Sequence, residues 1–328
     1  MVVETLKYGI NMKIIRKIID LKNKFVKKLL GRKFLDEVEV SAVERTLYMV
    51  RNEYTTMPRF GFHQPLDFDL DTYPVNFEKP IKLKTEELLI PAPDDRMGYS
   101  PENTNKYLDW GLEDKKFLMK HISQNHNIDK SLKILDFGCS SGRVLRHFYD
   151  EAKTKNWELY GVDIQAKPIQ WMREFLPNDF NVYTGTTMPI LPFPDNHFDV
   201  IYGFSIFTHI KYNWDMWLME INRVLKPGGL LIQTVHTEKA WKFYFENKNE
   251  QIVKDNHSPE MAKNSKMPYE YFYYGDANCS QIFWKTNIVK SYWGRYFKNV
   301  EVTPPPNQQS FQDWLFVKNR FNFLFGVI

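Results

Sequence analysis

The sequence predicts an α/β protein with a doubly wound, Rossmann-like and mostly parallel sheet. The first observation is residues 132–142, an apolar strand that ends in an acid and a glycine-rich turn, followed at once by a helical stretch. A second apolar run ends at Asp163, and a third ends at Gly203. Helical stretches alternate with these runs. Such alternation is typical of a parallel sheet that binds ligands at the carboxyl ends of its strands.

The elements of this sheet follow one another from about residue 100. A helix begins at Ser100 and runs to His121, because apolar residues recur with helical period after a Ser-Pro start. Strands and helices then alternate, and a final antiparallel hairpin closes a seven-stranded sheet. The expected strands are 134–136, 159–163, 182–183, 199–203, 230–235, 299–302 and 311–317, and the expected helices are 143–149, 168–175, 214–224 and 288–296.

We divide the chain into an N-terminal extension, residues 1–99, and the α/β domain, residues 100–328. Apolar residues from about 10 to 31 fall on one helical stripe between lysines and arginines, which predicts a basic amphipathic helix. Such a helix lies on an anionic lipid surface, docks a protein partner, or packs on its own domain with its lysines in water. Recurring prolines predict loops over 51–95. The aromatic-rich stretch of about 237–285 predicts an insertion or cap.

Composition limits the classes of function. Lys plus Arg total 44 against 40 for Asp plus Glu, a net charge of +4 in 328 residues, which is too small an excess for a dedicated nucleic-acid binder. The two cysteines, Cys139 and Cys279, indicate no disulfide framework and favour the cytoplasm, with peripheral attachment to a membrane left open. The sequence has no apolar run of about twenty residues that would span a membrane. The histidines and cysteines lack metal-ligand spacing, so we expect no metal.

The glycine-rich turn has the features of a cofactor site. Gly138 and Gly142 lack a Cβ, so the main chain can turn sharply and lie against a ligand, while free N–H groups at the following helix receive polar ligand atoms. Asp136 ends the first strand, where its carboxylate orders the turn or reaches the amino group of a ligand. Asp163 ends the second strand, where a carboxylate accepts hydrogen bonds from both hydroxyls of a ribose.

These features, followed by Lys226-Pro-Gly-Gly before the fifth strand, resemble the class I S-adenosylmethionine-dependent methyltransferases of the small-molecule type. The resemblance implies that S-adenosylmethionine is the cofactor, with Asp136 and the turn on its methionine part and Asp163 on its ribose. The middle glycine of the family's turn is Ser140 in this sequence, a small residue that the family tolerates.

The resemblance also implies where adenine and the methyl group lie. The acid that usually borders adenine is missing, and a hydroxyl of Thr186 or Thr187 is expected in its place. Ser205, after the fourth strand, is expected near the methyl group. The expected cofactor-binding residues are Asp136, Gly138, Cys139, Ser140, Gly142, Asp163, Ile164, Thr186, Thr187 and Ser205.

The resemblance favours a small-molecule acceptor, and we expect a hydroxyl of a sugar or other metabolite. Methyl transfer to a hydroxyl requires alignment with the departing sulfur and removal of a proton. His209 is the first candidate for the base and His236 the second, because a histidine titrates near neutrality. Arg96 is expected to pair with the carboxylate of the cofactor or with an anionic acceptor, or to hold a neighbouring aspartate in its loop. Tyr99 and Tyr273 are expected to contact the acceptor.

Three other hypotheses compete with this one. Residues 138–142, Gly-Cys-Ser-Ser-Gly, also fit the nucleophile elbow of serine hydrolases, with Ser140 as the nucleophile. That hypothesis leaves Asp163 unexplained and puts an acid close to the incipient oxyanion. A dinucleotide site would need a glycine three residues after Gly142, where the sequence has Leu145. The third hypothesis is an interaction protein that binds the cofactor without turnover and docks through its basic helix.

Overall fold

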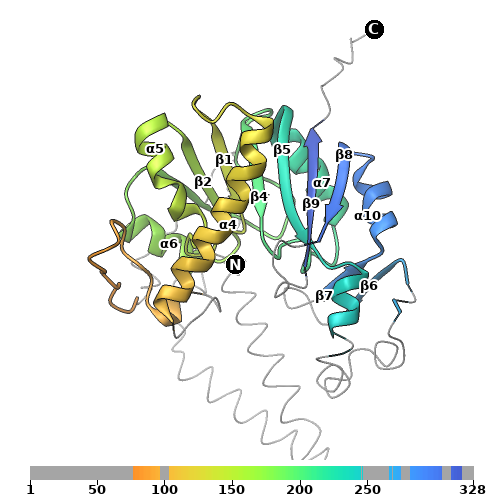
Figure 1. Ribbon diagram of the computed structural model, residues 1–328, viewed down its shortest axis with the longest axis horizontal. Coiled ribbons are helices and arrows are strands. Elements are labelled where there is room, and N and C mark those ends of the chain that lie inside the picture. The colour runs from red at the N-terminus through yellow and green to blue at the C-terminus, as the bar shows by residue number, and fades with distance from the viewer. Residues whose placement is uncertain are drawn as a thin grey trace, which may run out of the picture. The chain divides into compact units, whose positions relative to one another are not determined.

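The structure is a computed structural model (Figure 1). It describes residues 77–96, 103–244, 246, 266–267, 269–274, 281–304 and 312–319. The predicted basic helix of about 10–31, Tyr99 and the greater part of 51–95 lie outside the described residues. No described helix has both the length and the apolar character needed to cross a membrane.

The described part of the chain contains a seven-stranded sheet, which confirms the predicted α/β fold. Its strand order is β3-β2-β1-β4-β5-β9-β8. The strands from β1 to β5 run parallel, and β9 lies antiparallel between β5 and β8, as the arrow of β9 shows in Figure 1. The order reverses between β1 and β4, where α/β sheets bind ligands. The strands are β1 (Lys133–Phe137), β2 (Glu158–Asp163), β3 (Phe180–Thr184), β4 (Phe198–Gly203), β5 (Leu225–Val235), β8 (Phe297–Thr303) and β9 (Asp313–Asn319).

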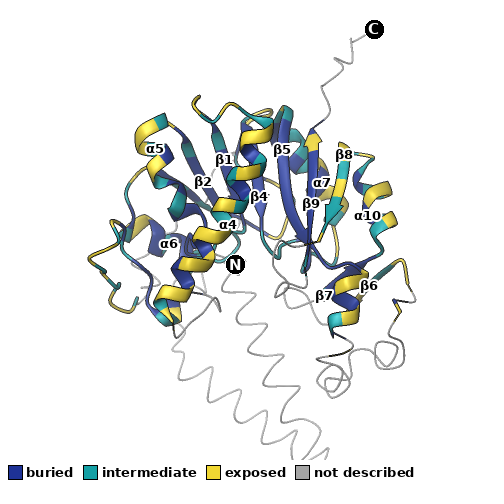
Figure 2. Cartoon of the chain, in the orientation of Figure 1, coloured by how far each residue is buried: buried dark blue, intermediate teal, exposed yellow. Residues whose placement is uncertain are grey.

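Helices cover both faces of the sheet because successive side chains of a strand point to opposite sides. On β1, Ile134 packs in one core with α4, η3 and α6, while Leu135 packs in the other core with α7 and α10. Figure 2 shows buried strands beneath helices whose outer faces are exposed. The helices are α4 (Thr104–Asn125), η3 (Leu145–Phe148), α5 (Tyr149–Lys155), α6 (Ala166–Phe175), α7 (Trp214–Val224) and α10 (Thr286–Trp293).

Three element boundaries differ from the predictions. The first helix begins at Thr104, because the side chain of Asn103 accepts a hydrogen bond from Lys106 N and caps it. The helix expected from Arg143 is replaced by a turn, the short 3₁₀ helix η3 and then α5. Lys226-Pro-Gly-Gly lies inside β5, where Gly228 has a φ of 78° and the register with β4 shifts.

Residues 77–96 are tied to the α/β domain by polar contacts. Asp95, in the 3₁₀ turn η2 (Pro93–Asp95), lies 2.6 Å from Lys167 Nζ at the start of α6. Arg146 Nη2 donates a 3.2 Å hydrogen bond to Leu88 O. This segment therefore lies against the elements that follow β1 and β2.

Part of the stretch expected as an insertion or cap forms a second sheet, of strands β6 (Tyr271–Tyr274) and β7 (Gln281–Trp284). Ile282 N donates to Thr208 O at 3.0 Å, and Trp284 N donates to His236 O at 2.9 Å. His236 directly follows β5, and Thr208 lies in the loop after β4. The hairpin thus covers the carboxyl ends of β4 and β5 and lies at the lower edge of the sheet in Figure 1.

Candidate cofactor site

The turn after β1 is built on backbone conformations that favour glycine. Gly138, Ser140 and Gly142 have φ values of 88°, 48° and 79°. A Cβ on Gly142 would lie 2.7 Å from Met172 Cε, so the turn also packs tightly against α6. Gly138 N donates to Val162 O at 2.7 Å, and the turn is thereby fastened to β2. Ser140 is the one non-glycine among the three, at a cost of about 1 kcal/mol.

The carboxylate of Asp163, at the end of β2, is bonded to this turn. Its Oδ2 accepts a 2.8 Å hydrogen bond from Ser140 N, and its Oδ1 accepts a 2.9 Å bond from Gln165 N. Burial raises the pKa of Asp163, and these backbone hydrogen bonds act in the opposite direction. Each carboxylate oxygen has two lone pairs, so both retain an acceptor position for a ligand hydroxyl.

Asp136 lies in the interior beneath the turn, with 3% of its surface exposed. Its Oδ2 accepts a 3.1 Å hydrogen bond from the hydroxyl of Tyr202, which is fully buried on β4. Burial raises the pKa of Asp136 to about 7, while the Tyr202 bond and the nearby Arg143 lower it. The carboxyl therefore titrates in the neutral range. Tyr202 was missed by the sequence analysis, and its place at the end of the fourth strand was the available signal.

The loop after β3 begins beside Asp163, since Gly185 N donates to Asp163 O at 2.8 Å. Thr186 is buried, and its hydroxyl exchanges hydrogen bonds with the backbone of Met188. Thr187 is exposed. Of the two threonines expected near adenine, Thr186 thus uses its hydroxyl to bond the backbone of the loop, and Thr187 is exposed to solvent.

Ser205, after β4, belongs to a polar cluster that joins three elements. Its φ is 60°, and its N–H donates to Thr234 Oγ1 at 2.7 Å. Gln312 Nε2 donates to Ser205 Oγ at 2.8 Å, and Thr234 Oγ1 donates to Gln312 Oε1 at 2.7 Å. Sequence analysis did not find Thr234 or Gln312. We refer to Ser205, Thr234 and Gln312 as the β4–β5 polar cluster.

The remaining predicted residues are His209 after β4, His236 after β5 and Tyr273 in β6. His209 is half-buried in the loop after β4, and its N–H donates to Ile206 O at 2.9 Å. His236 is 1% exposed and stacks on Phe283 within the hydrophobic cluster under the β6–β7 hairpin. Tyr273 is 39% exposed, with Lys211 Nζ 4.2 Å from its ring centroid.

Arg96 is fully buried and joins the N-terminal segment to α4. Its Nε donates to Pro91 O at 2.9 Å, and its Nη2 donates to Thr104 Oγ1 at 2.7 Å. The guanidinium carbon lies 5.1 Å from the ring centroid of Tyr107, whose hydroxyl is 3.3 Å from Ser141 Oγ. Arg96 is therefore linked through one tyrosine to the glycine turn.

The residues at the carboxyl ends of the parallel strands fit S-adenosylmethionine. Ser140 Oγ is buried and has no hydrogen-bond partner among the described residues. Buried polar atoms are normally hydrogen-bonded, so this atom fits a bond to a ligand. Asp163 offers acceptors to ribose hydroxyls, and the turn offers a main chain without bulky side chains. A Cβ on Gly138 would clash with Ile206, whose Cδ1 and Cγ1 would lie 2.0 and 2.7 Å from it, so only glycine fits at this position. Within the described residues no group of His, Cys, Asp and Glu has the arrangement of a metal site.

The same geometry argues against a serine hydrolase. Ser140 Oγ would need a histidine as hydrogen-bond partner, and no described histidine bonds to it. The backbone N–H of Ser140 points at the carboxylate of Asp163, an anion that would repel a developing oxyanion.

Part of the chain is similar to known methyltransferases. Residues 135–233 match the family model described as a methyltransferase domain. The chain is 30% identical to a sterol 24-C-methyltransferase of Gibberella zeae over 112 residues, which are 34% of this chain and 29% of that protein. It is 31% identical to the ubiquinone/menaquinone biosynthesis C-methyltransferase of Cupriavidus necator over 120 residues, which are 34% of this chain and 45% of that protein. The chain thus spans less than half the length of these two relatives.

Two solved structures are also similar. The PH0226 protein of Pyrococcus horikoshii OT3 matches 68% of this chain and 95% of its own, with 19% identity and a TM-score of 0.47. A SAM-dependent methyltransferase from Methanosarcina mazei matches 62% of this chain and 98% of its own, with 14% identity and a TM-score of 0.45.

Over residues 135–233, the family match, the strand order and the glycine turn bonded to the acid of β2 agree with a class I S-adenosylmethionine-dependent methyltransferase domain. The resemblance inferred from the sequence is confirmed.

Proposed function

We propose that this protein transfers the methyl group of S-adenosylmethionine to a small-molecule acceptor. The observation that carries the proposal is the 2.8 Å hydrogen bond between Ser140 N and Asp163 Oδ2, which brings the two main parts of the expected cofactor site together. When bound, the cofactor supplies an electrophilic methyl group on a sulfonium. Ser140 and the turn hold its amino-acid end, and Asp163 accepts hydrogen bonds from its ribose.

The acceptor that we propose is a hydroxyl of a sugar or another metabolite. The β4–β5 polar cluster supports this choice, because hydroxyl and amide groups at the carboxyl ends of β4 and β5 suit a polar acceptor. The cofactor held by Ser140 and Asp163 would supply an electrophilic methyl group, to which the hydroxyl oxygen would bond while the carbon–sulfur bond breaks and its electron pair stays on sulfur. His209, in the same loop as Ser205, takes the hydroxyl proton on its imidazole.

A second candidate is methyl transfer to a carbon of an apolar acceptor. The two similar relatives are named for C-methylation of a sterol and in quinone biosynthesis. The exposed aromatic rings of Tyr269 and Tyr273, beside and within β6, would suit such an acceptor. An acceptor panel with both polar and apolar members separates the two candidates.

Calorimetric titration with S-adenosylmethionine, S-adenosylhomocysteine and NAD tests the cofactor. We expect the first two to bind and NAD not to bind, whereas binding of NAD alone would reject the proposal. An acceptor panel that detects S-adenosylhomocysteine then tests turnover. Cofactor binding without product formation on any acceptor would favour the hypothesis of a non-catalytic interaction protein.

A further inference from the structure

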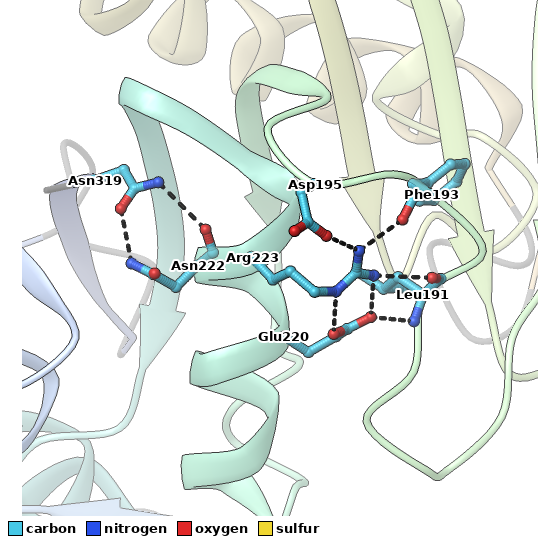
Figure 3. Close-up of polar contacts among 7 residues, drawn as sticks. All are labelled: Leu191, Phe193, Asp195, Glu220, Asn222, Arg223 and Asn319. Carbon is cyan, nitrogen blue, oxygen red and sulfur yellow. Dashed lines mark hydrogen bonds and ion pairs between the residues drawn. The ribbon is translucent and has the colours of Figure 1, made fainter. Parts of the chain in front are cut away.

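Arg223, near the end of α7, uses its whole guanidinium group in one contact network (Figure 3). Its Nε and Nη2 donate to the two carboxylate oxygens of Glu220 at 2.8 and 2.6 Å. Its remaining N–H groups donate to the loop after β3: Nη1 to Phe193 O and Asp195 Oδ1 at 2.8 and 2.7 Å, and Nη2 to Leu191 O at 3.2 Å. All five N–H donors of the guanidinium are therefore engaged.

Glu220 completes the network by accepting a 2.6 Å hydrogen bond from Leu191 N. Both backbone polar groups of Leu191 are thus held by one Glu–Arg pair. The pairing with Glu220 raises the pKa of Arg223, so the guanidinium keeps its charge at every physiological pH. Glu220 and Arg223 bond to main-chain atoms of Leu191 and Phe193. The network therefore fixes the path of the loop after β3 independently of the side chains at these two positions.

The gripped loop leads directly to the candidate cofactor site. It starts at Gly185, whose N–H is bonded to Asp163 O, and continues through Thr186 and Thr187 to the gripped residues. Leu191 and Phe193 are buried in the core shared with α7, while Met188 and Ile190 are exposed. The loop is fastened at both ends, at one end to the acid expected to bind ribose and at the other to Arg223.

We propose that Arg223, together with Glu220, is a positioning residue for the cofactor. It holds the loop after β3 in the path that borders adenine and thereby sets the affinity for S-adenosylmethionine. The inference rests on the proposed function, since it assigns Arg223 a role toward the same site. Loss of the clamp lets the loop leave the binding-competent conformation. A fall in the competent fraction to about one tenth raises the apparent Kd about tenfold.

Asn222, one residue before Arg223, supplies a matched control. Its Nδ2 donates to Tyr296 O and to Asn319 Oδ1 at 2.9 and 2.7 Å, so it ties the same turn of α7 to the other side of the fold (Figure 3). Asn222→Ala loses two half-buried hydrogen bonds of this turn of α7 without touching the loop after β3. Any effect of general destabilisation is thus shared by both variants.

The test measures two properties of the full-length wild-type, Arg223→Lys, Glu220→Gln and Asn222→Ala proteins. One is hydrogen exchange of the 185–195 peptide without ligand, and the other is the Kd for S-adenosylhomocysteine by calorimetry. Lysine keeps the charge but cannot reproduce the fork of the guanidinium. We expect faster exchange and an approximately tenfold higher Kd in Arg223→Lys, a smaller change of the same kind in Glu220→Gln, and neither change in Asn222→Ala.

A wild-type protein that binds S-adenosylhomocysteine and an Arg223→Lys variant with an unchanged Kd would overturn this inference alone. An equal rise of Kd in Asn222→Ala would also overturn it, because the effect would then be general destabilisation. A wild-type protein that does not bind the ligand would reject the proposed function and this inference with it. Glu220→Gln retains an acceptor for Leu191 N, so it supplies a folded variant if Arg223→Lys is poorly stable.

Discussion

The backbone N–H of Ser140 donates a 2.8 Å hydrogen bond to the carboxylate of Asp163, so the turn after β1 is shaped by the end of β2. The Asp163 side chain thereby has two roles. It orders the glycine turn, and it presents hydrogen-bond acceptors toward the ribose expected there. The same carboxylate is bonded to Gln165 N, at the start of α6. A change at Asp163 therefore alters the shape of the cofactor site as well as its chemistry.

Asp163→Asn is expected to weaken both binding and folding. Ser140 N and Gln165 N point at different oxygens of Asp163, and the amide replaces one of these oxygens with an N–H₂ group that cannot accept. One buried backbone donor is left without an acceptor, at a cost of about 1–3 kcal/mol. Urea unfolding should show this loss, and calorimetry should show a higher Kd for S-adenosylhomocysteine. Asp150→Asn, at an exposed position of α5, serves as the control, and equal behaviour of the two variants would contradict the prediction.

The titration of Asp136 predicts how stability depends on pH. Its pKa is raised to about 7 by burial, above the ordinary value of 3.8, so folding favours the protonated form. This contribution to stability is fully present below about pH 4 and is lost as pH rises to about 7. The gap corresponds to at most about 4 kcal/mol. Asp136→Asn, which is always neutral, should gain stability relative to wild type across this range. Urea unfolding from pH 4 to 8 measures the difference, and a constant difference would refute it.

The same carboxyl should make cofactor binding depend on pH in the opposite sense. If Asp136 contacts the cofactor as the resemblance implies, its ionised form attracts the ammonium group, and this form becomes populated as pH approaches 7. Affinity of the wild-type protein for S-adenosylhomocysteine should therefore rise between pH 5.5 and about 7.5. Calorimetry of Asp136→Asn over the same range should give a nearly constant Kd. A parallel rise in both proteins would assign the effect to another group.

Sequence patterns predicted the sheet and the position of the turn because both depend on local information. Alternating side chains such as Ile134 and Leu135 supply both faces of the sheet, and Gly138 and Gly142 supply conformations that other residues avoid. The short helix η3 was not predicted; Gly142, three residues before it, lies close to Met172 of α6, and such a contact is not local.

The parts of the site that sequence analysis missed depend on residues that meet only in the folded chain. Gln312 and Ser205 are 107 positions apart, and no periodicity links them, yet β9 places Gln312 beside the end of β4. Tyr202 was visible as the end of a strand, but its bond to Asp136 depends on β1 and β4 being neighbours. The ligand-facing acids are local features of strand ends, whereas their supporting partners are set by strand order.

Ser140 is expected to tolerate glycine better than a branched residue. Its φ of 48° lies in the left-handed region, where valine is strongly disfavoured and glycine is not. Ser140→Gly removes this strain but frees the unfolded chain, so its net effect on unfolding is expected to stay within about 1 kcal/mol. Ser140→Val should lose about 1–2 kcal/mol or more. Urea unfolding measures both.

The β4–β5 polar cluster predicts a variant that separates turnover from cofactor binding. Thr234→Val keeps the shape of the side chain but removes the acceptor of Ser205 N and the donor to Gln312 Oε1. Ser205, which the resemblance places near the methyl group, then loses the hydrogen bond that fixes its backbone. We expect kcat on the acceptor found by the panel to fall about tenfold, with an unchanged Kd for S-adenosylhomocysteine. Thr154→Val, on the exposed side of α5, is the control. A matching loss of cofactor affinity would mean that the cluster supports the cofactor instead.

The His209→Ala variant tests whether the reaction uses a general base. Its loop is anchored by Ile206 O, which accepts the N–H of His209, and by Thr208 O, which accepts from Ile282 of the β6–β7 hairpin. This anchoring holds the imidazole in the same loop as Ser205. If it removes the proton of a hydroxyl acceptor, His209→Ala should lower kcat by about 10²–10⁴ and abolish its rise with pH near neutrality. His236→Phe tests the other histidine, which is enclosed by aromatic rings. Unchanged turnover and pH dependence in His209→Ala would remove His209 from the mechanism, and an acceptor that loses no proton in the transfer step would then fit better.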